Sequence, residues 1–298
     1  MQPAIQFALQ SWSLPVPVTL ALVFAALLYL CGWFQLRLAF PDLIPVWRAV
    51  AFVCGLLSVW IAVGSPLATL DMVLLSAHMA QHLLLMTLGA ALILLGAPQL
   101  VLPHGFRRPL MSRILGPFFR SSSVQRLGRM TTEPVFCWLA AITVLIAWHV
   151  PAIYALGFES YMWHQIEHAS FFTAGLLFWW PVIPRWPGDA RSFRWSIVLY
   201  LFLATLPCDA LSAFLAFCDR VVYTLYLELP QRFNISPLQD QQFAGALMWV
   251  CVTFAYLVPA VILTMTLLST PRTEEQRPVR ADLAEKQPDN EPSSSSWT

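Results

Sequence analysis

Seven stretches of predominantly apolar residues constrain this chain more than any other feature of its sequence. Each is about 20 residues long, which is enough for a helix to cross the hydrocarbon core of a bilayer. A segment in lipid must satisfy its backbone hydrogen bonds internally, and a helix does so. The sequence therefore predicts an all-α polytopic membrane protein, a seven-transmembrane helix bundle, with helices at Val18–Leu36, Val46–Gly64, Leu70–Leu95, Pro134–Tyr154, Tyr161–Ile183, Trp195–Phe217 and Phe243–Leu268.

Composition agrees with a membrane location. Charged residues make up 11% of the chain and hydrophobic residues 58%, whereas an average soluble domain is about 25% charged. The net charge of +1 is no sign of nucleic-acid binding, because the basic residues are explained by membrane topology. We expect membrane lipid around the protein and no nucleic acid as a partner.

The basic residues predict the orientation of the bundle. Of the 17 lysine and arginine residues, only Arg220 and Arg232 fall on the same side of a seven-helix chain as the N-terminus. By the positive-inside rule the N-terminus is outside and the C-terminus is cytoplasmic. The expected organisation is a short extracytoplasmic N-terminus (1–17), a transmembrane domain (18–268) and a disordered cytoplasmic tail (269–298). The basic residues of the opposite side are Arg37, Arg48, Arg107, Arg108, Arg113, Arg120, Arg126, Arg129, Arg185, Arg191, Arg194, Arg272, Arg277, Arg280 and Lys286.

Two histidine pairs are placed in the outer half of this predicted bundle. His78 and His82 are four residues apart, so both rings project from one helix face. Asp71, two turns earlier, is expected to share that stripe. His164 and His168 form a second pair with the same spacing at the start of the fifth stretch.

Further candidate ligands lie at the same predicted depth. His149 is near the outer end of the fourth stretch, Asp240 opens the seventh, and Met79 follows His78. Met86 and Met248 add thioethers, although a methionine in a helix more often serves packing. Imidazole with thioether suits copper, while zinc and haem iron also accept imidazole. The predicted metal ligands are His78, His82, His149, His164, His168, Asp240 and Met79.

A transmembrane histidine can also serve only to join helices by hydrogen bonds. For one histidine the two roles are about equally frequent, but five at one depth favour a functional site. Glu167 is a candidate to orient a ligand ring, or to be solvated at a helix end. Asp209 is a candidate site residue, or a partner for backbone groups that Pro207 leaves free.

Several motifs together resemble the CtaG-type membrane proteins, which are seven-helix assembly factors of caa3-type cytochrome c oxidases. The resemblance implies a multi-pass protein of the bacterial inner (plasma) membrane that takes part in the maturation of a haem–copper oxidase, at the step that supplies copper. It implies oxidase subunits as partners and no enzymatic turnover. Carried over by motif, the family's residues here are the five histidines with Asp240 and Gln241. The motifs are HMAQHLLLM (78–86), LGAP (95–98), WHVPAIY (148–154), HQIEH (164–168), FWWPVI (178–183) and SPLQDQQFAGALMW (236–249).

Other functions fit the same residues. A b-type haem protein would use one histidine from each of two facing helices as axial ligands, and a copper permease would share the donor site. A zinc-dependent membrane hydrolase would use three histidines and a carboxylate such as Asp71 or Asp209. A retinal protein is excluded, because the only lysine is Lys286 in the tail. The sequence carries no signal for an oligomeric state.

Overall fold

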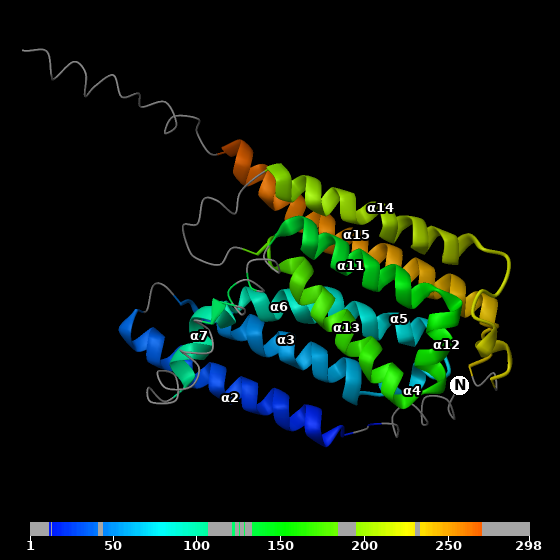
Figure 1. The fold of residues 1–298 in the computed structure, drawn as a ribbon, viewed down its shortest axis with the longest axis horizontal. Coiled ribbons are helices and arrows are strands. Elements are labelled where there is room, and N and C mark those ends of the chain that lie inside the picture. The colour runs from blue at the N-terminus through cyan, green and yellow to red at the C-terminus, as the bar shows by residue number, and fades with distance from the viewer. Residues whose placement is uncertain are drawn as a thin grey trace, which may run out of the picture.

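The protein is a bundle of helices that run roughly along one common axis (Figure 1). The computed structural model describes residues 12, 14–40, 44–106, 121, 122, 125, 128, 133–183, 195–229 and 233–269, and every regular element within these residues is helical. The all-α prediction is therefore confirmed. The elements are α2 (Val16–Ala39), α3 (Val46–Gly64), α4 (Leu67–Leu70), α5 (Leu75–Leu83), the π-helix η1 (Leu84–Gly89), α6 (Ala90–Leu95), α7 (Pro98–Gly105), α11 (Pro134–His149), α12 (Pro151–Glu159), α13 (Tyr161–Trp179), α14 (Trp195–Phe217), the 3-10 helix η4 (Thr224–Leu227) and α15 (Pro237–Ser269).

Parts of the predicted organisation lie outside the described residues. These are the tail from residue 270 onward, most of the N-terminal segment 1–17, and the two arginine-bearing stretches 107–120 and 184–194. The predicted disorder of the tail and the predicted side of the basic loops therefore stay predictions.

Five segments are long and apolar enough to cross a membrane, or six if the bent pair α11 and α12 forms one span. The remaining predicted stretch folds as α13, as expected, but does not qualify as a span. His164, Gln165, Glu167 and His168 in its first half lower the mean hydropathy of this helix. The seventh span is thus not established by length and composition. The five qualifying segments are Val16–Ala39, Val46–Leu70, Leu75–Leu95, Trp195–Phe217 and Pro237–Ser269.

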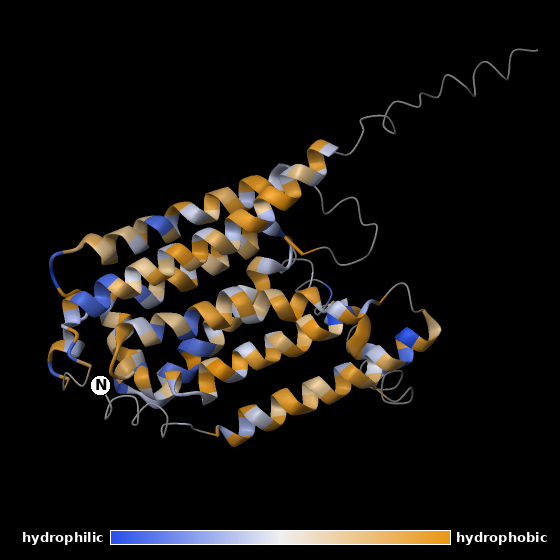
Figure 2. Ribbon diagram, turned by 180° about the vertical axis from the view of Figure 1, so that it is seen from behind, coloured by the Kyte–Doolittle hydropathy of each residue, from blue (hydrophilic) through white to orange (hydrophobic). Residues whose placement is uncertain are grey.

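Most residues along the helices are hydrophobic (Figure 2), and many large apolar side chains are exposed on the outside of the bundle. A water-soluble protein rarely exposes so much contiguous apolar surface. The exposed side chains therefore agree with a bundle that is surrounded by lipid. They include Phe24 and Leu27 of α2, Phe202 and Phe214 of α14, and Phe243, Phe254 and Ile262 of α15.

The fourth predicted stretch is broken at Pro151. α11 ends at His149, Val150 is extended, and α12 begins at Pro151 with its axis bent by 77°. Proline has no backbone N–H and pushes the preceding residue out of the helical region. The prediction of one continuous helix over Pro134–Tyr154 is therefore wrong, and α12 folds across the end of the bundle (Figure 1).

The third predicted stretch is also interrupted. Asp71 to Leu74 form a turn between α4 and α5, so the expectation that Asp71 continues the helical stripe of His78 is wrong. The carboxylate of Asp240 on α15 accepts hydrogen bonds from the backbone N–H groups of Leu75 and Ser76 and from the Ser76 hydroxyl. A side chain from a distant helix thus caps α5, because the first N–H groups of a helix have no partner within it.

The π-helix η1 brings α13 close to α5. The indole of Trp179 on α13 donates a hydrogen bond to the Met86 carbonyl at 3.2 Å, and Gly175 packs against the same peptide so closely that a side chain there would meet it. Gly175 and Trp179 lie about two and three turns beyond His168. These contacts hold the histidine-bearing half of α13 beside α5.

Candidate metal centre

Four imidazole rings from α5 and α13 meet at one end of the bundle. The rings of His78 and His82 are 4.3 Å apart between centroids, and those of His164 and His168 are 4.2 Å apart. Across the two helices, His78 lies 5.9 Å from His164 and His82 lies 5.7 Å from His168. The two predicted pairs therefore face each other and form one cluster.

The carboxylate of Glu167 lies in the middle of this cluster. Its Oε1 is 3.2 Å from His78 Nε2 and 3.4 Å from His82 Nε2, and its Oε2 is 3.7 Å from His164 Nδ1. A tetrahedral ion with bonds of about 2.0–2.1 Å holds its ligand atoms about 3.3–3.4 Å apart. The separations from Oε1 to the two Nε2 atoms match that spacing.

A second carboxylate, that of Asp71, reaches the cluster from the turn after α4. Its Oδ2 is 3.0 Å from His164 Nε2. Tyr226 in η4 donates a hydrogen bond to the backbone carbonyl of Asp71 at 2.9 Å, and its own hydroxyl lies 2.6 Å from that of Tyr154. Burial raises the pKa of Tyr226, so the hydroxyl stays protonated and keeps the turn in place.

Both carboxylates are withdrawn from solvent, since Asp71 and Glu167 are each 1% exposed. A buried carboxylate is strongly unfavourable unless a positive charge lies beside it. Protonated imidazole or a metal ion supplies such a charge. The ligand atoms fall into two groups that share His78, namely Asp71, His78, His164 and His78, His82, Glu167, and within each group all the ligand atoms lie within 4.8 Å of one another.

The structure thus brings together three of the predicted ligands, His78, His82 and His164. His168 contacts the rings of His82 and His164 but belongs to neither group of ligand atoms. The carboxylate of Asp240 serves as the cap of α5 instead. Among the described residues, Asp209 is in neither group.

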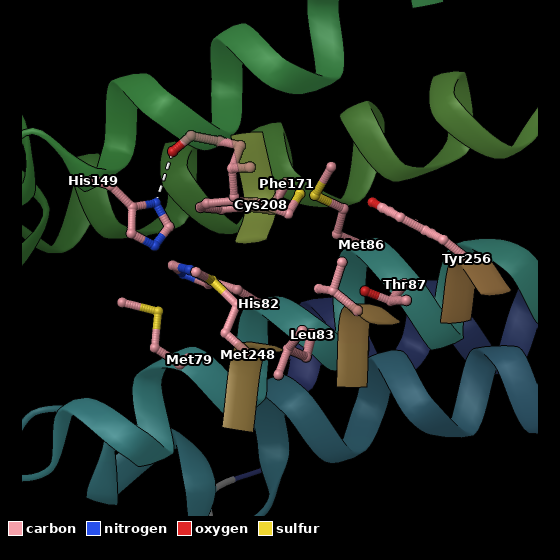
Figure 3. A pocket seen from close by; sticks show the side chains of 12 residues that line it. Met79, His82, Leu83, Met86, Thr87, His149, Phe171, Cys208, Met248 and Tyr256 are labelled. Carbon is pink, nitrogen blue, oxygen red and sulfur yellow. Dashed lines mark hydrogen bonds between the residues drawn. The ribbon is translucent and has the colours of Figure 1, made fainter. Parts of the chain in front are cut away.

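His149 and Met79 are found beside the cluster and not in it. Together with His82 they line a cavity between α5, η1, α11, α13, α14 and α15 (Figure 3). The Nδ1 atom of His149 is 2.7 Å from the Leu145 carbonyl oxygen, to which it donates a hydrogen bond. His149, one of the predicted ligands, therefore belongs to neither group of ligand atoms.

Two residues of the centre, Asp71 and Glu167, are absent from the predicted ligand set. A signal was available, because an ionisable side chain within an apolar segment is a functional candidate by default. The sequence identified both residues as candidates. It did not decide whether their carboxylates bind a metal, orient a ligand ring or serve only the structure of the helices.

Gly157 on α12 allows the Glu167 carboxylate to lie where it does. A Cβ atom at position 157 would be 2.6 Å from Glu167 Oε2. We expect Gly157→Ala to displace the carboxylate and to weaken binding of a divalent ion such as Zn²⁺ by roughly 10- to 100-fold. The substitution should not destabilise α12 itself, since alanine is more favourable than glycine in a helix by about 1 kcal/mol.

Titration calorimetry of the detergent-solubilised protein measures this effect. Leu156→Ala, which alters an exposed side chain of the same helix, is the matched control and should bind Zn²⁺ as the unchanged protein does. Equal affinities for the Gly157 variant and the control would show that the position of the carboxylate does not matter for binding.

Comparison with known proteins supports a specific family. The family model described as "Cytochrome c oxidase caa3 assembly factor (Caa3_CtaG)" matches residues 27–270. The match includes α2 from residue 27 onward, all of α3 to α15, and every residue of the two groups of ligand atoms.

Curated relatives occur in mycobacteria. The uncharacterized proteins Mb0105 of Mycobacterium bovis and MT0111 of Mycobacterium tuberculosis are each 26% identical over 256 residues, which cover 83% of this chain. The uncharacterized protein ML1998 of Mycobacterium leprae is 23% identical over 258 residues, or 84% of the chain. The alignments span 38% of the length of each of these relatives. No solved structure matches the chain significantly.

Proposed function

The chain belongs to the cytochrome c oxidase caa3 assembly factor family, and on that premise we propose that it binds copper within the membrane and helps to supply it to the oxidase during assembly. The observation that carries the proposal is the buried cluster of three imidazoles and two carboxylates. An assembly factor performs no catalytic turnover, so the cluster is a holding site for a cargo ion.

The donor set is suited to a divalent ion. Imidazole nitrogen and carboxylate oxygen are both accepted by Cu²⁺, and the charges of Asp71 and Glu167 balance the charge of such an ion in a buried place. Zn²⁺ accepts the same ligands. The family supports copper, because a haem–copper oxidase takes copper as it matures.

The arrangement gives less support to haem. The Glu167 carboxylate lies between the rings of His78, His82 and His164. A porphyrin with one axial histidine from each helix would have to occupy that space. The hydrolase alternative is set aside because the family is not a class of enzymes.

We further propose that the protein crosses the bacterial inner membrane seven times, with its N-terminus outside. α13 is the additional span, since 19 residues correspond to about 28 Å of helix. In its polar half Gln165 is exposed, but the side chains of Glu167 and His168 are buried and lie against His78 and His82 of α5, not against lipid. The positive-inside rule puts the cluster in the outer half of the membrane, where an oxidase subunit would receive the ion.

Metal analysis of the purified protein tests the proposal. We expect near-stoichiometric copper in the unchanged protein and a loss of more than tenfold in affinity for His78→Ala, because His78 is common to both groups of ligand atoms. His104→Ala is the matched control, since His104 is exposed on α7 and outside both groups.

Complementation in cells tests whether the metal site is needed for oxidase assembly. In a bacterium that lacks the protein, His104→Ala should restore a copper-loaded oxidase and His78→Ala should not. Copper content that is equal in the two variants, or a Soret absorption band in the purified protein, would contradict the proposal.

A further inference from the structure

A cavity of about 30 Å³ lies next to the cluster. This volume has room for a water molecule or a single ion. It lies between helices from the middle and the end of the chain, and its lining residues belong to α5, η1, α11, α13, α14 and α15. The side chains around it that carry a sulfur or an imidazole are Met79, His82, Met86, His149, Cys208 and Met248 (Figure 3).

The His149 ring presents an unpaired nitrogen to this cavity. Its Nδ1 donates to the Leu145 carbonyl, which leaves Nε2 with a free lone pair. Nε2 is buried and has no hydrogen-bond partner among the described residues, and Figure 3 shows it turned toward His82. A buried acceptor without a partner is unfavourable, so this nitrogen is placed for a ligand.

His82 adds a second imidazole of the same kind. Neither of its ring nitrogens has a hydrogen-bond partner within the described part of the chain, although Nε2 lies 3.4 Å from Glu167 Oε1. The side chain is 6% exposed. One ring therefore borders both the cluster and the cavity.

We propose that this cavity is a second copper site, which shares His82 with the carboxylate cluster, and that it binds Cu⁺ through His149, His82 and the thioethers of Met79 and Met248. Soft thioether ligands select Cu⁺. The described residues that line the cavity include no carboxylate, so the lining lacks the negative charge that a divalent ion needs in a buried place. The inference rests on the proposed function in that it takes copper to be the cargo.

The π-helix η1 contributes two consecutive residues to the lining of the cavity. Met86 and Thr87 follow each other in η1, and both line the cavity. Successive residues of an α-helix point about 100° apart. The π-helix winds more widely, and such segments are frequent at functional sites. The helical segment α5–η1–α6 is therefore a π-helix, not an α-helix, where Met86 and Thr87 line the cavity.

Anaerobic titration of the full-length, detergent-solubilised protein with Cu⁺, in competition with a coloured Cu⁺ chelator, measures this site. We expect Met79→Leu/Met248→Leu to lower the Cu⁺ affinity at least tenfold and to remove sulfur from the copper environment in X-ray absorption spectra. The exchange of methionine for leucine keeps the side-chain volume and is well tolerated in cores. Met265→Leu is the matched control, because Met265 is exposed on α15.

A second titration, with Zn²⁺, separates this site from the cluster. The double methionine variant should bind Zn²⁺ as the unchanged protein does, whereas Glu167→Gln should lose Zn²⁺ and keep Cu⁺. Unchanged Cu⁺ affinity in the double variant would overturn the inference. So would an equal loss of both ions in Glu167→Gln, since that result means a single site.

The titrations distinguish a failure of this inference from a failure of the proposed function. Cu⁺ binding that depends on the two methionines, with no divalent ion held by the cluster, leaves the cavity as a site and removes the cluster from the proposed function. If the cluster binds a divalent ion but Cu⁺ binding does not depend on the two methionines, the cluster remains part of the proposed function and the cavity is not a copper site.

Discussion

Glu167→Gln is expected to abolish divalent-metal binding at the cluster while the bundle stays folded. Glu167 contacts three of the imidazoles, and no other residue of the two ligand groups contacts as many. Glutamine has nearly the same shape, but it lacks the negative charge and is a poor ligand. The remaining carboxylate, that of Asp71, would leave a divalent ion with an unbalanced buried charge.

Thermal unfolding with and without metal measures this effect. An ion at 100 times its dissociation constant stabilises the folded state by about 2.7 kcal/mol. The unchanged protein should therefore unfold at a higher temperature when Cu²⁺ or Zn²⁺ is added, and the variant should show no increase. Glu159→Gln removes an exposed carboxylate from α12 and should respond as the unchanged protein does. A metal-dependent increase that persists in Glu167→Gln would remove Glu167 from the site.

Asp240→Ala is expected to have the largest effect on stability. The Asp240 carboxylate accepts hydrogen bonds from Leu75 N, Ser76 N and the Ser76 hydroxyl, and the side chain is 4% exposed. Removing it leaves buried donors without a partner at the start of α5. Loss of a helix cap and unsatisfied buried N–H groups together predict a decrease of about 2–3 kcal/mol in the free energy of unfolding.

Chemical unfolding in detergent, followed by circular dichroism, measures that decrease in the metal-free protein. Asp240→Asn keeps one acceptor oxygen and should lose less stability. Both variants should still bind one equivalent of metal when folded, because Asp240 belongs to neither group of ligand atoms. A variant that unfolds normally but fails to bind metal would instead support the original prediction from the sequence, in which Asp240 is a ligand.

The extents of several helices could be predicted from the sequence alone. The stretches Val46–Gly64 and Trp195–Phe217 fold as α3 and α14 with the same first and last residues. Apolar length is sufficient here because a chain in lipid can satisfy its backbone only as a helix or a closed barrel. The i,i+4 spacing likewise predicts that His78 and His82 share a helix face, as His164 and His168 do, and their ring contacts confirm it.

The family could also be recognised from the sequence. Short motifs around the histidines and at the start of the last helix carried the resemblance, and the family model matches residues 27–270. A motif preserves residue types and spacing within one segment. It does not state which atoms of two segments meet.

Only the tertiary structure decided the membership of the candidate site. Asp71 joins the cluster because the chain leaves the helix at the turn after α4, and Glu167 fills its centre because Gly157 leaves space for it. His149 instead faces a separate cavity beside His82. Periodicity within one helix determines which side chains share a face, but the partners of that face depend on how closely two helices approach. That approach is set by small residues, turns and caps elsewhere in the chain, such as Gly175 and Asp240.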